Sequence, residues 1–304
     1  MIHNGVTLKN MTCNGAKVKK WKHNGVQVYS AGNVVTYNVD SGVSYKEEVD
    51  SGASCLSPKT FTPTKSGWTF VGWRVDTTAS ESVLTSKVMD SDPITLYAVF
   101  KQTVTLTTVA NGVTSKSNGT RCYNNGNTVN PTFTVANPTK SGTTFKGWSS
   151  SASSTSITNS SISGLSLSAS TTRYAVFKYD DAVLVTKTGY WFGYLNESDY
   201  LEIDAFKYSA VTLAGWSHMR AGNTASTSSG TAHLYLDGRS IASVTHGTGY
   251  QSGTGYNYNI DGTYSITSTS GTVKMYCSGS PVGQGLVVES GTATITGVGR
   301  TIVG

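Results

Sequence analysis

The sequence predicts an all-β protein made of several small modules in series. Charged residues make up only 13% of the 304 residues, whereas aromatic residues make up 10% and glycine occurs 33 times. Short alternating runs of Val, Thr, Tyr and Ile lie between Gly- and Asn-containing turn signals along most of the chain. A long block also occurs twice, and internal duplication marks repeated domains. Only one short stretch, around residues 81–89, predicts a helix.

The duplicated block is organised around one phrase. PTKSGWTFVGW over residues 63–73 returns as PTKSGTTFKGW over residues 138–148, and each copy is followed by YAVFK, at residues 97–101 and 174–178. Pro-Thr-Lys-Ser-Gly predicts a turn, and the phenylalanine that follows alternates with polar neighbours as in a strand with one buried face. A glycine directly before each tryptophan predicts a bulge or a close approach of the backbone.

These two blocks resemble the Listeria–Bacteroides repeat, the B-repeat of internalin-like surface proteins. The resemblance covers about residues 36–178 and implies two β-grasp-like modules, over residues 36–101 and 102–178, of the kind used as spacers or contact surfaces in extracellular and phage proteins. It implies no catalytic residue. Thr143 takes the place of the aromatic Trp68, so the second copy departs further from the family pattern.

Residues 1–35 contain a smaller repeat, in which His-Asn-Gly or Cys-Asn-Gly occurs three times at intervals of ten residues. Asn-Gly is a strong hairpin signal, so three short hairpins are expected. Such hairpins cannot bury a core alone, and the segment is therefore expected to dock on a partner. The residues predicted to attach it are Lys17, Lys19, Lys20, Trp21, Lys22 and Tyr29.

Two other interpretations of this segment remain open. Its lysines are also typical of a solvated strand edge that deters edge pairing. Binding of nucleic acid is the least favoured, because the interleaved aromatic and basic residues of single-strand binders are missing. The segment over residues 17–30 also resembles short N-terminal segments of phage structural proteins.

Residues 179–304 predict a β-sandwich of jelly-roll type, because short strands recur at near-regular spacing with glycine turns between them. Asp237-Gly238 and Asp261-Gly262 are predicted hairpin turns. The predicted strands cover residues 182–186, 200–203, 210–213, 233–236, 240–244, 263–267, 273–276, 286–288 and 293–296.

A loop rich in Tyr, Gly, Ser and Asn, over residues 246–259, is the candidate binding element. Rigid aromatic anchors among small polar residues are typical of binding loops, so the loop is a candidate for contact with a host glycan or receptor. The alternative is a long hairpin tip whose tyrosines cover the end of the sandwich. The candidate contact residues are Tyr250, Gln251, Tyr256, Asn257 and Tyr258.

No motif predicts catalysis or a cofactor. The sequence lacks a Gly-x-Ser-x-Gly elbow, a phosphate-binding loop and a His-Glu-x-x-His motif. The acids Glu197, Asp199, Glu202 and Asp204 offer oxygen ligands for Ca²⁺, but alternating acids on a strand more often form its wet face. The four cysteines are widely spaced and are expected to be unpaired thiols.

The chain begins without a signal segment and has no apolar run long enough to span a membrane. Together with the repeats, this favours a non-enzymatic virion protein of a tailed bacteriophage, made in the host cytoplasm and released by lysis. Its expected partners are other virion proteins, a host-surface glycan or receptor, and further copies of itself in a symmetric homo-oligomer. The alternatives are a receptor- or glycan-binding adhesin and a glycan-degrading tail enzyme that uses Glu202 and Asp204.

Overall fold

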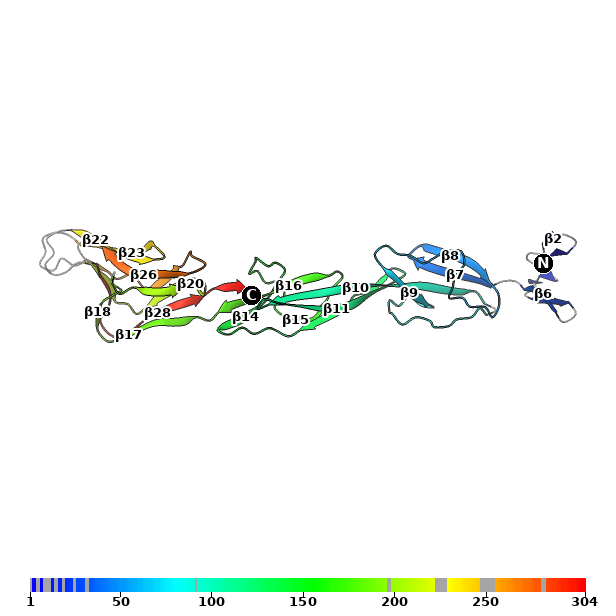
Figure 1. Cartoon of the computed structure of the whole chain (residues 1–304), viewed down its shortest axis with the longest axis horizontal. Coiled ribbons are helices and arrows are strands. Elements are labelled where there is room, and N and C mark those ends of the chain that lie inside the picture. Colours follow the sequence, from blue (N-terminus) through cyan, green and yellow to red (C-terminus); the bar gives the residue numbers. More distant parts are fainter. Residues whose placement is uncertain are drawn as a thin grey trace. The chain divides into compact units, whose positions relative to one another are not determined.

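The computed structural model contains only strands, turns and irregular segments in the part of the chain that it describes (Figure 1). That part covers residues 2–3, 6–7, 12–13, 16–17, 20–23, 26–30, 33–90, 92–195, 198–221, 229–246, 255–279 and 283–304, with side chains described from residue 33 onward. The all-β prediction is confirmed. Within these ranges no helix is long and apolar enough to cross a membrane.

The N-terminal strands form three separate hairpins. The turns lie between paired residues two positions apart from each other's ends, with His3 opposite Val6 and His23 opposite Val26. The three predicted Asn-Gly hairpins are therefore confirmed in their pairing. The strands are β1 (Ile2–His3) with β2 (Val6–Thr7), β3 (Thr12–Cys13) with β4 (Ala16–Lys17), and β5 (Lys20–His23) with β6 (Val26–Ser30).

The chain divides into two compact units, one of residues 1–107, 115–135 and 162–171 and the other of residues 108–114, 136–161 and 172–304. The first repeat lies wholly in the first unit. The second repeat contributes to both units, because the long strand β10 (Ile94–Ala110) and the strand β11 (Val113–Asn124) each extend into both.

The first repeat is a mixed sheet in the order β8-β7-β10-β9, made with β7 (Asn33–Asp40), β8 (Val43–Val49) and β9 (Thr69–Arg74). β7 and β8 form an antiparallel hairpin, and β10 then pairs with β7 in parallel and with β9 in antiparallel orientation. One face buries an apolar core that includes Tyr37, Trp73, Leu96 and Phe100. Burial of these large side chains is the main force that stabilises so small a sheet.

The predicted bulges next to the tryptophans are confirmed in both repeats. The register between β9 and β10 shifts where Gly72 pairs with Val99. In the second repeat β14 (Thr143–Ser149) and β16 (Thr171–Tyr179) shift in the same way, where Gly147 pairs with Val176. A Cβ at Gly72 would lie 2.8 Å from Val83 Cγ2, and one at Gly147 would lie 2.7 Å from a backbone oxygen, so both sites require glycine.

The two repeats also build the same aromatic core. The ring centroids of Phe70 lie 5.3 Å from Trp73 and 5.7 Å from Phe100. The equivalent distances from Phe145 are 5.6 Å to Trp148 and 5.8 Å to Phe177. The second repeat adds a hairpin between β11 and β12 (Asn127–Val129) and a pair of strands, β13 (Thr132–Val135) and β15 (Ile162–Ser166).

The predicted helix at residues 81–89 is wrong. The backbone there pairs with distant segments instead of with itself: Leu84 N donates to Trp73 O, and Met89 N donates to Ala53 O. Val83 meanwhile fills the space left open by Gly72. The segment therefore packs across the sheet in an extended form, because its backbone hydrogen bonds and its apolar side chain are both used by the sheet that it covers.

The C-terminal region is a β-sandwich made of three four-stranded sheets, in the orders β17-β28-β20-β25, β18-β27-β21-β24 and β19-β26-β22-β23. Their strands are β17 (Ala182–Thr188), β18 (Trp191–Tyr194), β19 (Leu201–Asp204), β20 (Tyr208–Ala214), β21 (His218–Ala221), β22 (Gly230–Leu236), β23 (Arg239–His246), β24 (Gly255–Asn257), β25 (Gly262–Ser265), β26 (Thr272–Gly279), β27 (Gly283–Val288) and β28 (Thr292–Gly299). All nine predicted strands are present, and β18, β21 and β24 were not predicted.

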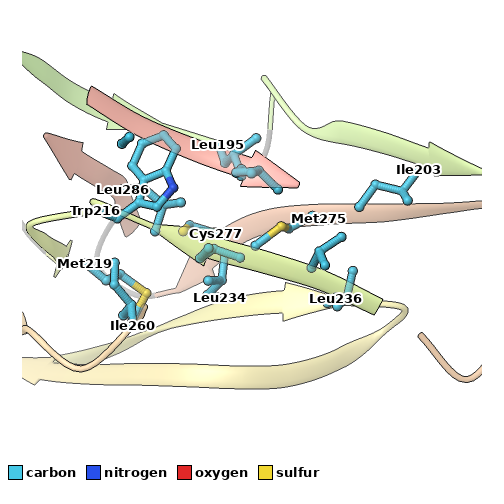
Figure 2. Packing of buried hydrophobic residues seen from close by; sticks show 14 of the residues in the cluster. Leu195, Ile203, Trp216, Met219, Leu234, Leu236, Ile260, Met275, Cys277 and Leu286 are labelled. Carbon is cyan, nitrogen blue, oxygen red and sulfur yellow. The ribbon is translucent and has the colours of Figure 1, made fainter. Parts of the chain in front are cut away.

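One continuous apolar core joins these sheets. Figure 2 shows Leu195, Trp216, Met219, Leu234 and Met275 packed between them, each no more than 3% exposed. The polar edge of the buried indole is satisfied, since Trp216 Nε1 donates to Thr294 O at 2.9 Å.

Of the two predicted hairpin turns, one is confirmed. Asp237 and Gly238 have φ of 54° and 72° and connect β22 to β23. Asp261-Gly262 is not a hairpin turn, because β24 and β25 on either side of it belong to different sheets. Asp261 instead accepts hydrogen bonds from the backbone nitrogens of Gly215 and Trp216, and so fixes the start of the segment that leads into β21.

The end of the chain returns to the second repeat. The last strand, β29 (Thr301–Val303), pairs with β16 in antiparallel orientation. Arg300 holds this return in place: its side chain donates to the carbonyls of Ala205, Tyr208 and Ser268, and its own carbonyl accepts from Tyr179 N. The sequence boundary at residue 178 therefore omits a strand that completes the sheet of the second repeat.

Candidate binding site

The candidate site lies on the outer face of the sheet β18-β27-β21-β24. In β21, Met219 points into the core and is fully buried, so its neighbours His218 and Arg220 belong to the opposite face. The register places Arg220 opposite Tyr256 of β24. Alternation along two adjacent strands thus brings a histidine, an arginine and a tyrosine to one surface.

Two exposed tyrosines form the centre of the site. The rings of Tyr256 and Tyr258 are nearly parallel, with an interplanar angle of 18° and centroids 5.9 Å apart. Both lie against the imidazole of His218, at centroid distances of 4.8 and 5.3 Å. Tyr256 is 44% and Tyr258 is 70% exposed, whereas His218 is only 3% exposed. We call Tyr256, Tyr258, His218, Arg220 and Glu289 the aromatic cluster.

The charges of the aromatic cluster are nearly balanced. Arg220 Cζ lies 5.6 Å from the ring centroid of Tyr256, and Glu289 Oε1 lies 3.8 Å from His218 Nδ1. Burial lowers the pKa of His218; Glu289 opposes this effect and Arg220 adds to it. The imidazole is therefore neutral at pH 7, and its buried Nδ1 has no hydrogen-bond partner among the described residues.

The structure gives Asn257 a different position from the two tyrosines. Its Nδ2 donates to Ser243 O at 2.7 Å, and its Oδ1 accepts from Asn259 N at 3.0 Å. Both ends of the amide are thus used to hold the chain between Tyr256 and Tyr258. Asn257 is a positioning residue for the aromatic cluster.

The sequence identified only part of this site. Tyr256 and Tyr258 are brought together, whereas Tyr250 and Gln251 lie outside the described residues. His218, Arg220 and Glu289 were missed because β21 was not predicted. The alternation in Trp216-Ser-His-Met-Arg220 was the available signal, but nothing in the sequence shows that this stretch pairs with the tyrosine-bearing strand.

A second aromatic group lies at β18. Tyr190 is 71% and Trp191 is 44% exposed, and Lys187 Nζ lies 4.0 Å from the ring centroid of Trp191. The Trp191 indole donates to Thr188 O, so its polar edge is already bound. Lys187 also covers Tyr194, which in turn stacks on Trp216 of the core. This group therefore serves mainly to close the sandwich.

The predicted attachment residues lie in or next to the N-terminal hairpins. Lys17 lies in β4, and Lys20, Trp21 and Lys22 lie in β5. Trp21 pairs with Tyr29 of β6, so the two expected hydrophobic anchors are opposite each other in register. Lys19 lies outside the described residues.

The acids of the sandwich have structural roles. Glu202 lies opposite Lys274 across β19 and β26. Asp204 caps the next turn, since its Oδ1 accepts from Phe206 N and Lys207 N and its Oδ2 lies 3.5 Å from Lys207 Nζ. Glu197 lies outside the described part of the chain, within which no group of three or more His, Cys, Asp or Glu side chains is arranged to hold a metal ion.

Cys55, Cys122 and Cys277 are free and buried. Burial raises the pKa of all three thiols, and raises that of Cys277 to about 12. A thiol that stays protonated is a poor nucleophile, so these cysteines act as small apolar core residues.

Comparison with known families identifies the repeats. The model of the Listeria–Bacteroides repeat domain matches residues 34–99 and again residues 103–176. No curated protein and no solved structure matches the chain. The chain therefore contains two copies of the Listeria–Bacteroides repeat, followed by a β-sandwich that carries the aromatic cluster.

Proposed function

We propose that this chain is a non-enzymatic structural protein of a tailed bacteriophage particle, anchored by its N-terminal hairpins and displaying its C-terminal sandwich to the host surface. The observation that carries the proposal is the state of the hairpins. Each of the three is a two-stranded sheet by itself, with no further strand paired to it among the described residues. Isolated hairpins of this length are marginal in water, so a partner surface has to complete them.

The rest of the molecule supports a display role. The two repeats bury their aromatic cores and belong to a family that implies spacers or contact surfaces. The sandwich, by contrast, exposes the rings of Tyr256 and Tyr258 on a rigid support. An anchor, a spacer and a display domain in this order suit a capsid decoration, a head or collar fibre, or a tail component.

The proposal is tested on purified particles. Particles assembled with the full chain and with a chain that lacks residues 1–32 are compared by mass spectrometry and by electron cryomicroscopy. We expect the shortened protein to fold, to stay soluble and to be missing from the particles. Incorporation of the shortened protein at the level of the full chain contradicts anchoring by the hairpins, and absence of the full chain from particles contradicts the virion assignment.

A free receptor- or glycan-binding adhesin is the second candidate, and the aromatic cluster favours it. In that case the protein binds host cells but does not co-purify with particles. A glycan-degrading tail enzyme is less well supported, because Asp204 caps a turn and Glu202 faces Lys274. Release of reducing sugar from host envelope that is lost in a Glu202→Gln, Asp204→Asn double variant would reverse this order.

A further inference from the structure

We propose that Tyr256 and Tyr258 form a binding site for an uncharged carbohydrate, with Arg220 and Glu289 as polar contacts at its rim. The proposal names the ligand class for the display domain and rests on the proposed function for its biological setting. The binding chemistry itself is carried by the geometry of the aromatic cluster.

The first argument is the exposure of the two rings. Large aromatic side chains normally bury most of their surface, yet Tyr258 is 70% and Tyr256 is 44% exposed. Exposed apolar surface of this kind is typical of contact sites when it is gathered in one place. The ring faces carry partial negative charge and attract the positively polarised C–H groups that line one face of a pyranose.

The second argument is the support beneath the rings. His218 is almost fully buried and touches both tyrosines, and Asn257 is held at both ends of its amide. The two rings are therefore positioned before any ligand arrives. Binding to a prepared surface costs little side-chain entropy, which favours even a weakly held ligand such as a sugar.

The third argument is the charge of the site. Among its described residues the aromatic cluster has one cation, Arg220, and one anion, Glu289, and the imidazole between them is neutral at pH 7. A site for an acidic polymer needs an excess of positive charge, and one for a cation needs the reverse. A balanced pair of opposite charges instead offers a donor and an acceptor to hydroxyl groups, which suits an uncharged sugar.

The test uses the full chain and measures retardation in native gels that contain dextran, mannan, galactan or, as an acidic polymer, polygalacturonate. We expect at least one neutral polysaccharide to retard the protein. Tyr256→Ala and Tyr258→Ala are each expected to weaken that binding about tenfold. The matched control is Tyr200→Ala, since Tyr200 is also exposed, at 41%, but lies next to a different sheet under Lys274.

Three outcomes overturn the proposal: no retardation by any neutral polysaccharide, retardation by polygalacturonate only, or equal loss in Tyr200→Ala and the two cluster variants. Near-ultraviolet circular dichroism confirms that each variant is folded. Particle incorporation is measured on the same variants. Loss of sugar binding with normal incorporation separates the cluster from the anchor, so failure of this inference is distinguishable from failure of the proposed function.

Discussion

His218 is the most deeply buried ionisable residue of the aromatic cluster, and its burial has a consequence for stability. Its imidazole faces Glu289, Arg220 and the two tyrosines, and burial lowers its pKa from the ordinary value of 6.5. The unfolded chain takes up a proton at this histidine near pH 6.5, whereas the folded chain does so only at lower pH. Below pH 6.5 the unfolded state therefore binds more protons, and folding is weakened.

We predict that the sandwich loses stability as the pH falls from 7.5 to 5.5 and that His218→Gln reduces this loss. The replacement removes the proton uptake that favours the unfolded state at low pH. The measurement is the midpoint of thermal unfolding at several pH values. His233→Gln is the matched control, because His233 lies in β22 of the same sandwich and bonds to Ser240 Oγ. An equal pH dependence in wild type and His218→Gln would refute the assignment.

At the residue scale, the sequence predicted chemistry better than it predicted neighbours. Tyr256 and Tyr258 stood out by composition alone, because exposed aromatics among Gly and Asn are unusual. Arg220 and His218 did not, since their place beside the tyrosines depends on the pairing of β21 with β24. Pairing between strands far apart in the chain is set by the whole core, and a local pattern does not contain it.

At the scale of elements, the position of Trp68 explains how the two repeats differ. Its ring contacts Tyr123 of the second repeat at 5.8 Å, and Arg121 Cζ lies 5.1 Å from its centroid. Lys65 Nζ lies 3.8 Å from the ring centroid of Tyr123, whose hydroxyl donates to Asp40. These five residues join the first repeat to the β11–β12 hairpin of the second.

The equivalent residue of the second repeat, Thr143, faces a different neighbour. It pairs with Tyr179 of β16, the strand whose other edge is taken by β29. No hairpin of a third repeat follows, so an aromatic side chain at this position would lack the partners that Trp68 has. The loss of the family's aromatic residue thus follows from what comes next in the chain.

We predict that Trp68→Thr destabilises the contact between the first repeat and the β11–β12 hairpin by about 2 kcal/mol, because a half-buried aromatic ring and its cation–π contact are lost. Hydrogen exchange of the β11 and β12 amides measures this local opening. Trp68→Phe keeps a ring and should retain most of the protection. Thr143→Val, the matched change in the second repeat, should leave these amides within about 0.5 kcal/mol of wild type.

Protection of β11 and β12 that is unchanged in Trp68→Thr would show that the joint does not depend on the aromatic ring. The elements themselves were largely predictable, since alternation and Gly turns located nine strands of the sandwich and both bulged tryptophan strands. The false helix at residues 81–89 and the missed β29 share one cause. Both segments are short, and their conformation is decided by the distant strands to which they bond.

At the scale of the whole molecule, the charge is concentrated in one segment. The chain has a formal net charge of +6, and residues 1–32 contain five lysines and no acid, so the remainder has a net charge of only 6 − 5 = +1. A charge gathered in this way is typical of a docking surface for an acidic partner. Opposite charges on two partners accelerate their encounter, and salt screens the effect over about 8 Å at physiological ionic strength.

We predict that replacing four hairpin lysines by glutamine slows attachment to the particle roughly tenfold, because the electrostatic steering is removed. The control replaces four exposed lysines elsewhere by glutamine, which gives the same net charge of 6 − 4 = +2. Attachment of purified protein to particles that lack it is followed over time at low and high NaCl. The hairpin set is Lys17, Lys19, Lys20 and Lys22, and the control set is Lys46, Lys59, Lys116 and Lys146.

The pair of variants separates local charge from total charge. If only the hairpin variant slows, and if NaCl slows the wild type to the same rate, the lysines guide the hairpins to an acidic surface. If both variants slow equally, the overall charge of the protein governs attachment and the segment has no special part in it. If neither slows, the hairpin lysines serve to keep their strand edges from pairing, as lysines on exposed edges do elsewhere, and the paired Trp21 and Tyr29 become the remaining candidates for the contact.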